Sequence, residues 1–112
     1  MGYPVCKEEY AQALKQKMAE KTALVISTTY CGYCNKAKSL LGRYNIEHSE
    51  IVLDNLNPND QMEISNCIYG RNQRFVPFIY LKSQPIGGYG ELVKLQQSGV
   101  LESEEYSKPQ ES

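Results

Sequence analysis

Two cysteines, Cys31 and Cys34, constrain this chain more than any other feature, because of the segments on either side of them. Residues 23–27 form a short apolar run that is partly β-branched, which is typical of a strand buried on both faces. Beyond Cys34, apolar residues recur at spacings of three and four as far as Tyr44, as they do along one face of a helix. The sequence therefore predicts a strand, a turn and a helix, with Cys31 at the start of the helix.

The rest of the chain continues this alternation of helices and strands. Further helices are expected at 7–20, 61–69 and around 92–98, and further strands at 46–53, 75–81 and 86–88. Strands that alternate with helices indicate a parallel pair joined by a crossover, and the last two strands indicate an antiparallel hairpin. The expected fold class is α/β, with a four-stranded mixed sheet flanked by helices on both faces.

The length and charge of the chain limit its size class and its partners. A chain of 112 residues fits a single domain, with a core at about 7–101 and a polar C-terminal tail at 102–112. Twelve basic and thirteen acidic residues give a net charge of -1 without a polybasic run, so neither nucleic acid nor a membrane is an expected partner. No stretch resembles a signal peptide, which favours a reducing compartment, and we expect a cytoplasmic protein.

In a reducing compartment, a Cys-x-x-Cys pair indicates either metal binding or redox chemistry. A closed zinc site needs further ligands, but Cys6 and Cys67 form no second pair of this kind. The only histidine, His48, lies in an expected strand. A buried pair of structural thiols is the other alternative, and redox chemistry is the favoured interpretation.

The expected position of Cys31 gives it the character of an attacking thiolate. Free backbone N–H groups at a helix start favour an anion, and Lys36 and Lys38 add positive charge nearby. We therefore expect Cys31 to be a thiolate near neutral pH. Cys34, one turn further along, is expected to be more buried and to be the resolving thiol that closes an internal disulfide.

Three motifs, taken in their order along the chain, resemble those of the dithiol glutaredoxins, a family with the thioredoxin fold. Residues 29–34, Thr-Tyr-Cys-Gly-Tyr-Cys, are similar to the active-site motif of that family, although Gly32 stands where proline is commonest. Val76-Pro77 is similar to the end of its Thr-Val-Pro motif, and residues 86–92 are similar to its Gly-Gly motif. The resemblance covers about 10–101. Thioredoxins are near neighbours, but they usually carry Trp-Cys-Gly-Pro-Cys, and this chain has no tryptophan.

The resemblance implies a thioredoxin-like fold and assigns roles to particular residues. Cys31 and Cys34 would be catalytic, and Pro77 would be cis and lie beside the Cys31 sulfur. The backbone of Val76 would pair with glutathione as an added strand does. The implied glutathione-binding residues are Thr28, Tyr33, Arg74, Val76, Pro77, Gly90 and Glu91.

Carboxylate recognition is the second role that the resemblance implies. The N–H groups of Gly90 and Glu91, at a helix start, would hold the γ-glutamyl carboxylate of glutathione. Tyr33 would flank the site, and Arg74 or Arg71 would attract the glycyl carboxylate.

The chain also departs from the family pattern. Thr28 stands where the family often has lysine, Phe75 stands where it has threonine, and Gly90 stands where an acidic residue is common. Each departure removes or moves a contact to glutathione. We therefore expect weaker or rearranged glutathione binding, with the backbone contacts retained.

The activity implied by the resemblance is that of a glutathione-dependent disulfide oxidoreductase. It would reduce protein disulfides and glutathionylated proteins by dithiol and monothiol exchange, with glutathione as co-substrate. The expected state is a monomer. The alternative is a dimer that binds a [2Fe–2S] cluster through Cys31 and glutathione, with a storage or delivery role, which the backbone freedom of Gly32 permits.

Other residues receive plainer interpretations. Cys6, near the N-terminus, and Cys67, on a helix, are expected to be ordinary thiols, and a regulatory disulfide between them is the alternative. His48 is expected on the surface of a strand. The nine tyrosines are interpreted as core and rim packing, because no basic groove accompanies them.

Overall fold

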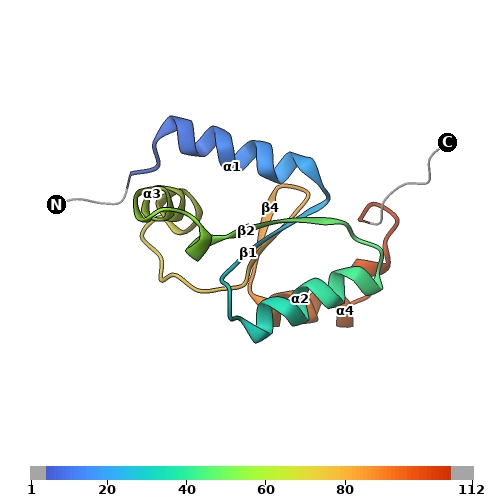
Figure 1. Cartoon of the computed structure of the whole chain (residues 1–112). Coiled ribbons are helices and arrows are strands. Elements are labelled where there is room, and N and C mark those ends of the chain that lie inside the picture. The colour runs from blue at the N-terminus through green and yellow to red at the C-terminus, as the bar shows by residue number, and fades with distance from the viewer. Residues whose placement is uncertain (1–4, 107–112) are drawn as a thin grey trace.

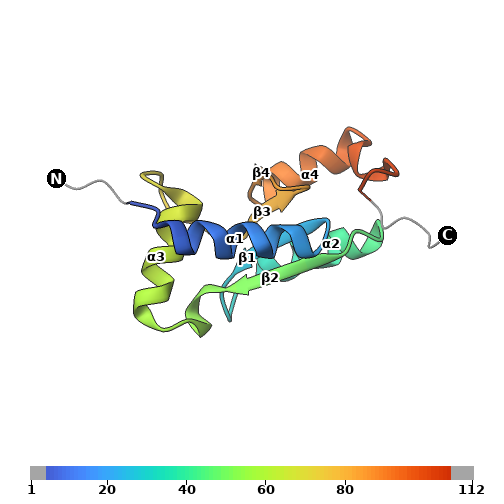
Figure 2. The same cartoon turned by 90° about the horizontal axis from the view of Figure 1, so that it is seen from above.

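The computed structural model describes residues 5–106 and contains a four-stranded sheet in the order β2-β1-β3-β4. The strands are β1 (Ala23–Ser27), β2 (His48–Val52), β3 (Phe78–Leu81) and β4 (Gln84–Gly87). The helices are α1 (Glu8–Glu20), α2 (Gly32–Arg43), α3 (Pro58–Tyr69) and α4 (Tyr89–Gln97), with short 3₁₀ helices η1 (Leu53–Asn55) and η2 (Val100–Glu102). Helices α1 and α3 lie on one side of the sheet and α2 and α4 on the other (Figure 1, Figure 2). The predicted fold class and order of elements are confirmed.

Strand β1 lies inside the sheet and pairs with two neighbours of opposite direction. It runs parallel to β2 and antiparallel to β3, and β3 forms an antiparallel hairpin with β4. Lys82 and Ser83, between β3 and β4, both have positive φ, at 50° and 65°. Positive φ at two consecutive turn residues suits the twist of a tight hairpin. The predicted parallel pair and the predicted hairpin are therefore both present.

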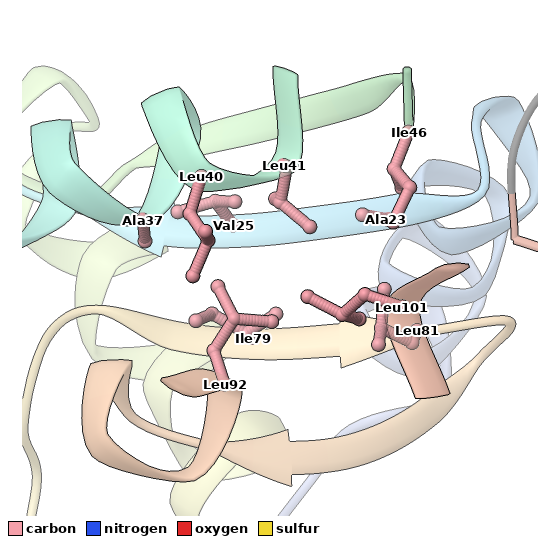
Figure 3. Packing of buried hydrophobic residues seen from close by; sticks show 10 residues of the cluster. All are labelled: Ala23, Val25, Ala37, Leu40, Leu41, Ile46, Ile79, Leu81, Leu92 and Leu101. Carbon is pink, nitrogen blue, oxygen red and sulfur yellow. The ribbon is translucent and has the colours of Figure 1, made fainter. Parts of the chain in front are cut away.

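Alternate residues of β1 enter two separate hydrophobic clusters. Ala23 and Val25 belong to the cluster between the sheet and helices α2 and α4 (Figure 3). Leu24 and Ile26 belong to the cluster between the sheet and helices α1 and α3. All five residues of β1 are buried, because helices cover both faces of the sheet. Packing in both clusters holds β1 in place, and with it the start of the loop that leads to the two cysteines.

Two elements begin at other residues than the sequence predicts. Helix α3 begins at Pro58 rather than at 61, because the Asn57 side chain caps it by accepting the Asp60 N–H at 2.8 Å. Proline suits the first helical position, where its missing N–H would have no partner. Strand β3 begins at Phe78 rather than at 75, because Pro77 has no N–H to donate to a neighbouring strand. The segment 75–77 is therefore left outside the sheet ladder.

The expectation of a surface position for His48 is wrong in part. His48 opens β2 and is half-buried, and this burial lowers the pKa of its imidazole.

The polar tail expected at 102–112 is described only as far as Tyr106, and 107–112 lie outside the described residues. Among residues 5–106, no helix is both long enough and apolar enough to cross a bilayer.

The main expectation for Cys6 and Cys67, two ordinary thiols, is wrong, because the structure contains a disulfide between them, and a regulatory role for it stays a prediction. The two residues form a disulfide between the segment before α1 and the C-terminal part of α3, with their Cα atoms 4.6 Å apart. They are separated by 61 positions in the sequence, so the spacing carried no information on distance. Packing of α1 against α3 brings the segment before α1 to α3 (Figure 1, Figure 2).

Candidate active site

The N-terminus of α2 holds the cysteine pair. Cys31 is the residue that caps α2, and its Sγ accepts the backbone N–H of Cys34 at 3.1 Å. The two sulfurs form a disulfide, so the structure describes the oxidised pair. Cys34 is 1% exposed, whereas Cys31 is half-buried. Of the two sulfurs, that of Cys31 is therefore the one that an incoming thiolate can reach.

The loop that leads from β1 to Cys31 is held by a residue that the sequence interpretation missed. The carboxylate of Asp54, in η1, accepts the backbone N–H of Thr29 at 2.9 and 3.2 Å from its two oxygens. Thr28 is half-buried beside this contact, and Tyr30 is almost fully exposed. Asp54 thus anchors the loop from the end of the neighbouring strand β2.

A shallow groove next to the cysteine pair gathers residues from three separate parts of the chain. The lining comes from Tyr33 of the cysteine motif, from the start of α4, and from the 75–77 segment that precedes β3 and is called the groove floor below. The groove residues are Tyr33, Phe75, Val76, Pro77, Gly88, Tyr89 and Gly90. The Val76–Pro77 peptide bond is cis, as the resemblance implied.

Aromatic rings define the wall of the groove beside α2. The rings of Tyr33 and Tyr89 lie with their centroids 5.6 Å apart, which closes the space between α2 and α4. The ammonium of Lys36 lies 5.1 Å from the centroid of the Tyr33 ring, a cation–π contact. Tyr89 was not among the predicted site residues, and its position follows only from the packing of α4 against α2.

The two glycines before α4 are required by close approach. Gly87 has a φ of 121°, and a Cβ there would lie 3.0 Å from Cγ of Glu91. A Cβ on Gly88 would lie 3.3 Å from the Phe75 ring and 3.5 Å from the Pro77 carbonyl oxygen. A side chain at position 88 would push α4 away from the 75–77 segment, whereas Gly87 is required by its positive φ and by the side chain of Glu91. Gly88 therefore allows the close approach of α4 to the 75–77 segment.

Glu91 shapes the electrostatics of the α4 N-terminus. Its carboxylate accepts the backbone N–H of Gly88 at 2.9 Å. This bond, together with the backbone N–H of Glu91 itself, lowers the pKa of the carboxyl group. A negative charge at a helix start is favourable, because the free N–H groups there carry partial positive charge. The start of α4 consequently presents both N–H donors and a fixed carboxylate.

The carbonyl of Phe75 ties the groove to α3. The buried hydroxyl of Tyr69, the last residue of α3, donates a hydrogen bond to this carbonyl oxygen. Burial raises the pKa of Tyr69 to about 12, so the hydroxyl keeps its proton and remains a donor. The rings of Tyr69 and Phe78 meet edge to face at 5.5 Å, on the same side of the sheet. Tyr69 had no predicted role, and nothing in its local sequence signals one.

The charge of Lys38 is not available to Cys31 in the way the sequence suggested. Its ammonium pairs with the carboxylate of Glu50 on β2 at 2.8 Å, and the Ser27 hydroxyl donates to the same carboxylate. Burial acts to raise the pKa of Glu50, but these two hydrogen bonds outweigh it and the net effect is a lowered pKa. Lys38 and Glu50 therefore hold α2 against the sheet.

Not all of the predicted glutathione-binding residues line the groove. Tyr33, Val76, Pro77 and Gly90 do so, and Glu91 lies directly behind them at the start of α4. Thr28 and Arg74 do not line it. Arg74 is exposed in the loop between α3 and the groove.

The donor set does not fit a metal centre within one chain. Among residues 5–106, no three His, Cys, Asp or Glu side chains are grouped so that they could hold a metal ion. A [2Fe–2S] cluster takes four ligands, and the alternative of a cluster-bridged dimer would take Cys31 from each of two chains and two glutathione sulfurs. One chain supplies a single accessible sulfur for it, that of Cys31, and this alternative stays a prediction.

Comparison with known proteins points consistently to one family. The family model for glutaredoxin matches residues 23–86. Glutaredoxin-1 of Saccharomyces cerevisiae is 34% identical over 98 residues, which cover 85% of this chain and 89% of the yeast protein. A buckwheat glutaredoxin–glutathione complex superposes with a TM-score of 0.70 at 28% identity, covering 85% of this chain and 89% of the buckwheat chain. A wheat glutaredoxin superposes with a TM-score of 0.75 at 25% identity, covering 88% and 90%.

Proposed function

The chain belongs to the glutaredoxin family and is a glutathione-dependent thiol–disulfide oxidoreductase, and we propose that it reduces both protein disulfides and glutathionylated proteins through Cys31 and Cys34. The observation that carries this proposal is the asymmetry of the pair at the start of α2. Cys31 is within reach of a substrate, and Cys34 is buried behind it. Such an arrangement suits one thiol that attacks and another that resolves.

In the dithiol route, the Cys31 thiolate attacks one sulfur of a protein disulfide and displaces the other as a thiolate. The resulting mixed disulfide is resolved when Cys34, after losing its proton, attacks Sγ of Cys31 and releases the second substrate thiolate. This step yields the Cys31–Cys34 disulfide that the structure contains. Two molecules of glutathione then reduce this disulfide and leave as glutathione disulfide, so that two electrons pass from glutathione to the substrate.

In the monothiol route, Cys31 alone carries the reaction. Its thiolate attacks the glutathione sulfur of a glutathionylated protein, so the protein leaves as a free thiol and glutathione remains on Cys31. A second glutathione thiolate attacks that glutathione sulfur, which releases glutathione disulfide and restores the Cys31 thiolate. The N–H group of Cys34, 3.1 Å from the Cys31 sulfur, stabilises the thiolate as nucleophile and as leaving group.

The groove beside Cys31 is the proposed glutathione site. The 75–77 segment lies outside the sheet ladder, which leaves the Val76 backbone able to pair with an extended peptide. At the start of α4, the N–H group of Gly90 is proposed to donate to the γ-glutamyl carboxylate. The N–H group of Glu91 contacts the Glu91 carboxylate and is proposed to donate to the ligand once that carboxylate turns to the ligand's ammonium. The Glu91 carboxylate is a partner for the ammonium of the same γ-glutamyl group, because that group carries both charges.

Peripheral residues complete the proposed site less directly. Arg74, in the exposed loop before the groove, is proposed to attract the glycyl carboxylate as a long-range charge. Thr28 is proposed to act through the Cys31 loop, which Asp54 holds at Thr29. Neither residue lines the groove, and both are expected to matter less than Val76, Gly90 and Glu91.

The test is glutathione-dependent reduction of two substrates by the wild type, Cys31→Ser and Cys34→Ser. With a small glutathione mixed disulfide, Cys34→Ser retains activity and Cys31→Ser loses it. With a protein disulfide as substrate, both variants lose activity. Activity of Cys31→Ser on either substrate would overturn the assignment of the nucleophile. Loss of both activities in Cys34→Ser would overturn the monothiol route.

Cellular role and location are separate proposals. We propose a cytoplasmic protein that carries electrons from glutathione to protein thiols and so supports redox homeostasis, because that compartment keeps glutathione reduced. Fluorescence microscopy of the tagged full chain tests the location. Accumulation in a chloroplast, the compartment named for one relative in Arabidopsis thaliana, would contradict it.

A further inference from the structure

A second cysteine pair lies away from the active site, on the other side of the sheet. Cys6 precedes α1, Cys67 lies near the end of α3, and the two form a disulfide. The segment before α1 reaches α3 in both views of the fold (Figure 1, Figure 2). No role in the proposed oxidoreductase reaction involves this pair.

The surroundings of the second pair make its sulfurs accessible to exchange. Cys6 is exposed and Cys67 is half-buried, so a small thiolate can approach the bridge from the side of Cys6. Cys67 lies two positions before the end of α3, where backbone carbonyl groups disfavour a nearby anion. Cys67 is therefore a poor leaving group, and exchange at this bridge is slow compared with exchange at Cys31.

The segment before α1 is fastened to α3 by more than the disulfide. The ammonium of Lys7 pairs with the Glu63 carboxylate of α3 at 2.8 Å, and the Glu63 side chain is 7% exposed. Further along α1, the Tyr10 hydroxyl donates to Asp60 at 2.7 Å. These contacts do not depend on the disulfide, so we expect them to keep the two thiols near each other when the bridge is open.

A short chain of contacts connects the second pair to the glutathione groove. Cys67 is two residues before Tyr69, and the buried Tyr69 hydroxyl holds the carbonyl oxygen of Phe75. Phe75 lies in the groove, and its ring limits the approach of α4 at Gly88. The position of the last turn of α3 therefore helps to set the position of the groove floor.

We propose that Cys6 and Cys67 form a second, reversible thiol–disulfide site that exchanges with glutathione and clamps the end of α3 against the N-terminal segment. The closed bridge holds the 75–77 segment in the position that binds glutathione, and the open dithiol loosens it. This coupling rests on the proposed function, because it acts on the glutathione groove. The exchange of Cys6 and Cys67 with glutathione does not depend on the proposed function.

Glutathione disulfide closes the bridge in two balanced steps. The Cys6 thiolate attacks one sulfur of glutathione disulfide, giving a Cys6–glutathione mixed disulfide and one glutathione thiolate. Cys67, after losing its proton, attacks Sγ of Cys6, forms the bridge and displaces the second glutathione thiolate. Two thiols lose two electrons, glutathione disulfide gains them, and the released thiolates take up the two protons. Two molecules of glutathione open the bridge by the reverse steps.

The first experiment measures the exchange without any contribution from the active site. The full chain with Cys31→Ser and Cys34→Ser is equilibrated with glutathione and glutathione disulfide at a series of ratios. Free thiols are trapped with a maleimide and counted by mass spectrometry. The expected result is one transition from no labelled thiols to two, at Cys6 and Cys67. Two thiols that stay free at every ratio, or a bridge that stays closed at every ratio, would overturn the proposal.

The second experiment measures the coupling to the groove. Cys6→Ser removes the bridge and leaves the α3 side chains in place, and Lys15→Ala is the matched control at another exposed residue of this region. The proteins are first oxidised so that the bridge of the wild type is closed, and initial rates are taken before the glutathione of the assay opens it. With a small glutathione mixed disulfide, KM is then expected to be roughly 2- to 30-fold higher in Cys6→Ser than in the wild type and to stay unchanged in Lys15→Ala. An unchanged KM in Cys6→Ser, with the first experiment positive, would overturn the clamp alone. A wild type without turnover would overturn the proposed function and leave the exchange result standing.

Discussion

The two disulfides of this chain lie at opposite ends of helices and close loops of very different length. Cys31 and Cys34 are three positions apart, and Cys31 begins a helix. Cys6 and Cys67 are 61 positions apart, and Cys67 lies near the end of a helix. In the first pair a backbone N–H points at the sulfur, at 3.1 Å. In the second pair Cys67 lies in the last turn of α3, and the partial negative charge of a helix end disfavours a thiolate.

The difference shows that the surroundings of a cysteine pair decide whether it suits a reaction or suits holding segments of the chain together. A short loop closed at a helix start constrains little of the unfolded chain, but it gives a stabilised and reachable thiolate. In the long loop, the position of Cys67 near a helix end makes this cysteine a poor nucleophile and a poor leaving group, but the bridge to Cys6 ties distant segments together. The first setting suits repeated exchange, and the second suits a clamp.

The largest expected effect separates the two pairs by activity. Cys31→Ser should lower the turnover of a glutathione mixed disulfide by about 1,000-fold or more, because it removes the nucleophile. Cys6→Ser should act only through KM, by roughly 2- to 30-fold. Steady-state kinetics of both variants, coupled to NADPH oxidation by glutathione reductase, measure this contrast. Equal losses in the two variants would abolish the distinction.

The next effect concerns stability, and here the loss of the Cys6–Cys67 pair is expected to have the larger effect. With disulfides intact, Cys6→Ser should lower the free energy of unfolding by about 4 kcal/mol, because the bridge closes a loop of 61 positions. Replacing Cys31 and Cys34 together by serine should cost less than about 2 kcal/mol, because that loop is short. Urea unfolding without reductant measures both values. A larger loss at the active-site pair would contradict the expected order.

A smaller effect compares the thiolates of the two pairs directly. In variants that retain a single cysteine, alkylation of Cys31 should have its pH midpoint at least about one unit below that of Cys67. The reason is that the start of α2 stabilises a thiolate and the end of α3 does not. Rates of reaction with iodoacetamide across a pH series give both midpoints. Coinciding midpoints would show that helix position does not distinguish the two cysteines.

The smallest effect compares two ion pairs, one formed by Lys7, which follows Cys6 in the sequence, and one formed by Lys38, one helical turn after Cys34. Hydrogen bonding to Glu63 raises the pKa of Lys7 above its ordinary 10.5, so this stabilisation is present below that pH and is lost as the pH rises through the raised value. The pKa of Glu50 is lowered, against the effect of burial, from its ordinary 4.5. Its stabilisation is therefore present above that pH and is lost as the pH falls through the lowered value.

Two variants test this opposition. Lys7→Met should lose stability relative to the wild type at neutral pH and converge with it at alkaline pH. Lys38→Met should differ most at neutral pH and converge with the wild type at acid pH. The urea midpoint of each variant as a function of pH gives the four comparisons. A Lys7→Met difference that persists at alkaline pH would contradict the assigned role of the ion pair.

The sequence was sufficient wherever the signal was local. The apolar run at 23–27 and the helical spacing after Cys34 predicted β1, α2 and the placement of Cys31 at a helix start. The three motifs predicted most of the groove, including Tyr33, Val76 and Gly90. The predicted starts of α3 and β3 were wrong, because the side-chain cap at Asn57 and the missing N–H donor at Pro77 decide those boundaries.

What the sequence determined by itself is the order of elements, the family and the position of the Cys31–Cys34 pair at a helix start, because periodicity and short motifs depend on neighbours along the chain. Only the tertiary structure decided that Asp54 holds the Cys31 loop, that Tyr69 holds the groove floor and that Cys6 meets Cys67. These contacts join residues whose separation in space is fixed by the packing of helices on the sheet. For Cys6 and Cys67, no spacing along the chain determines the distance across α1 and α3.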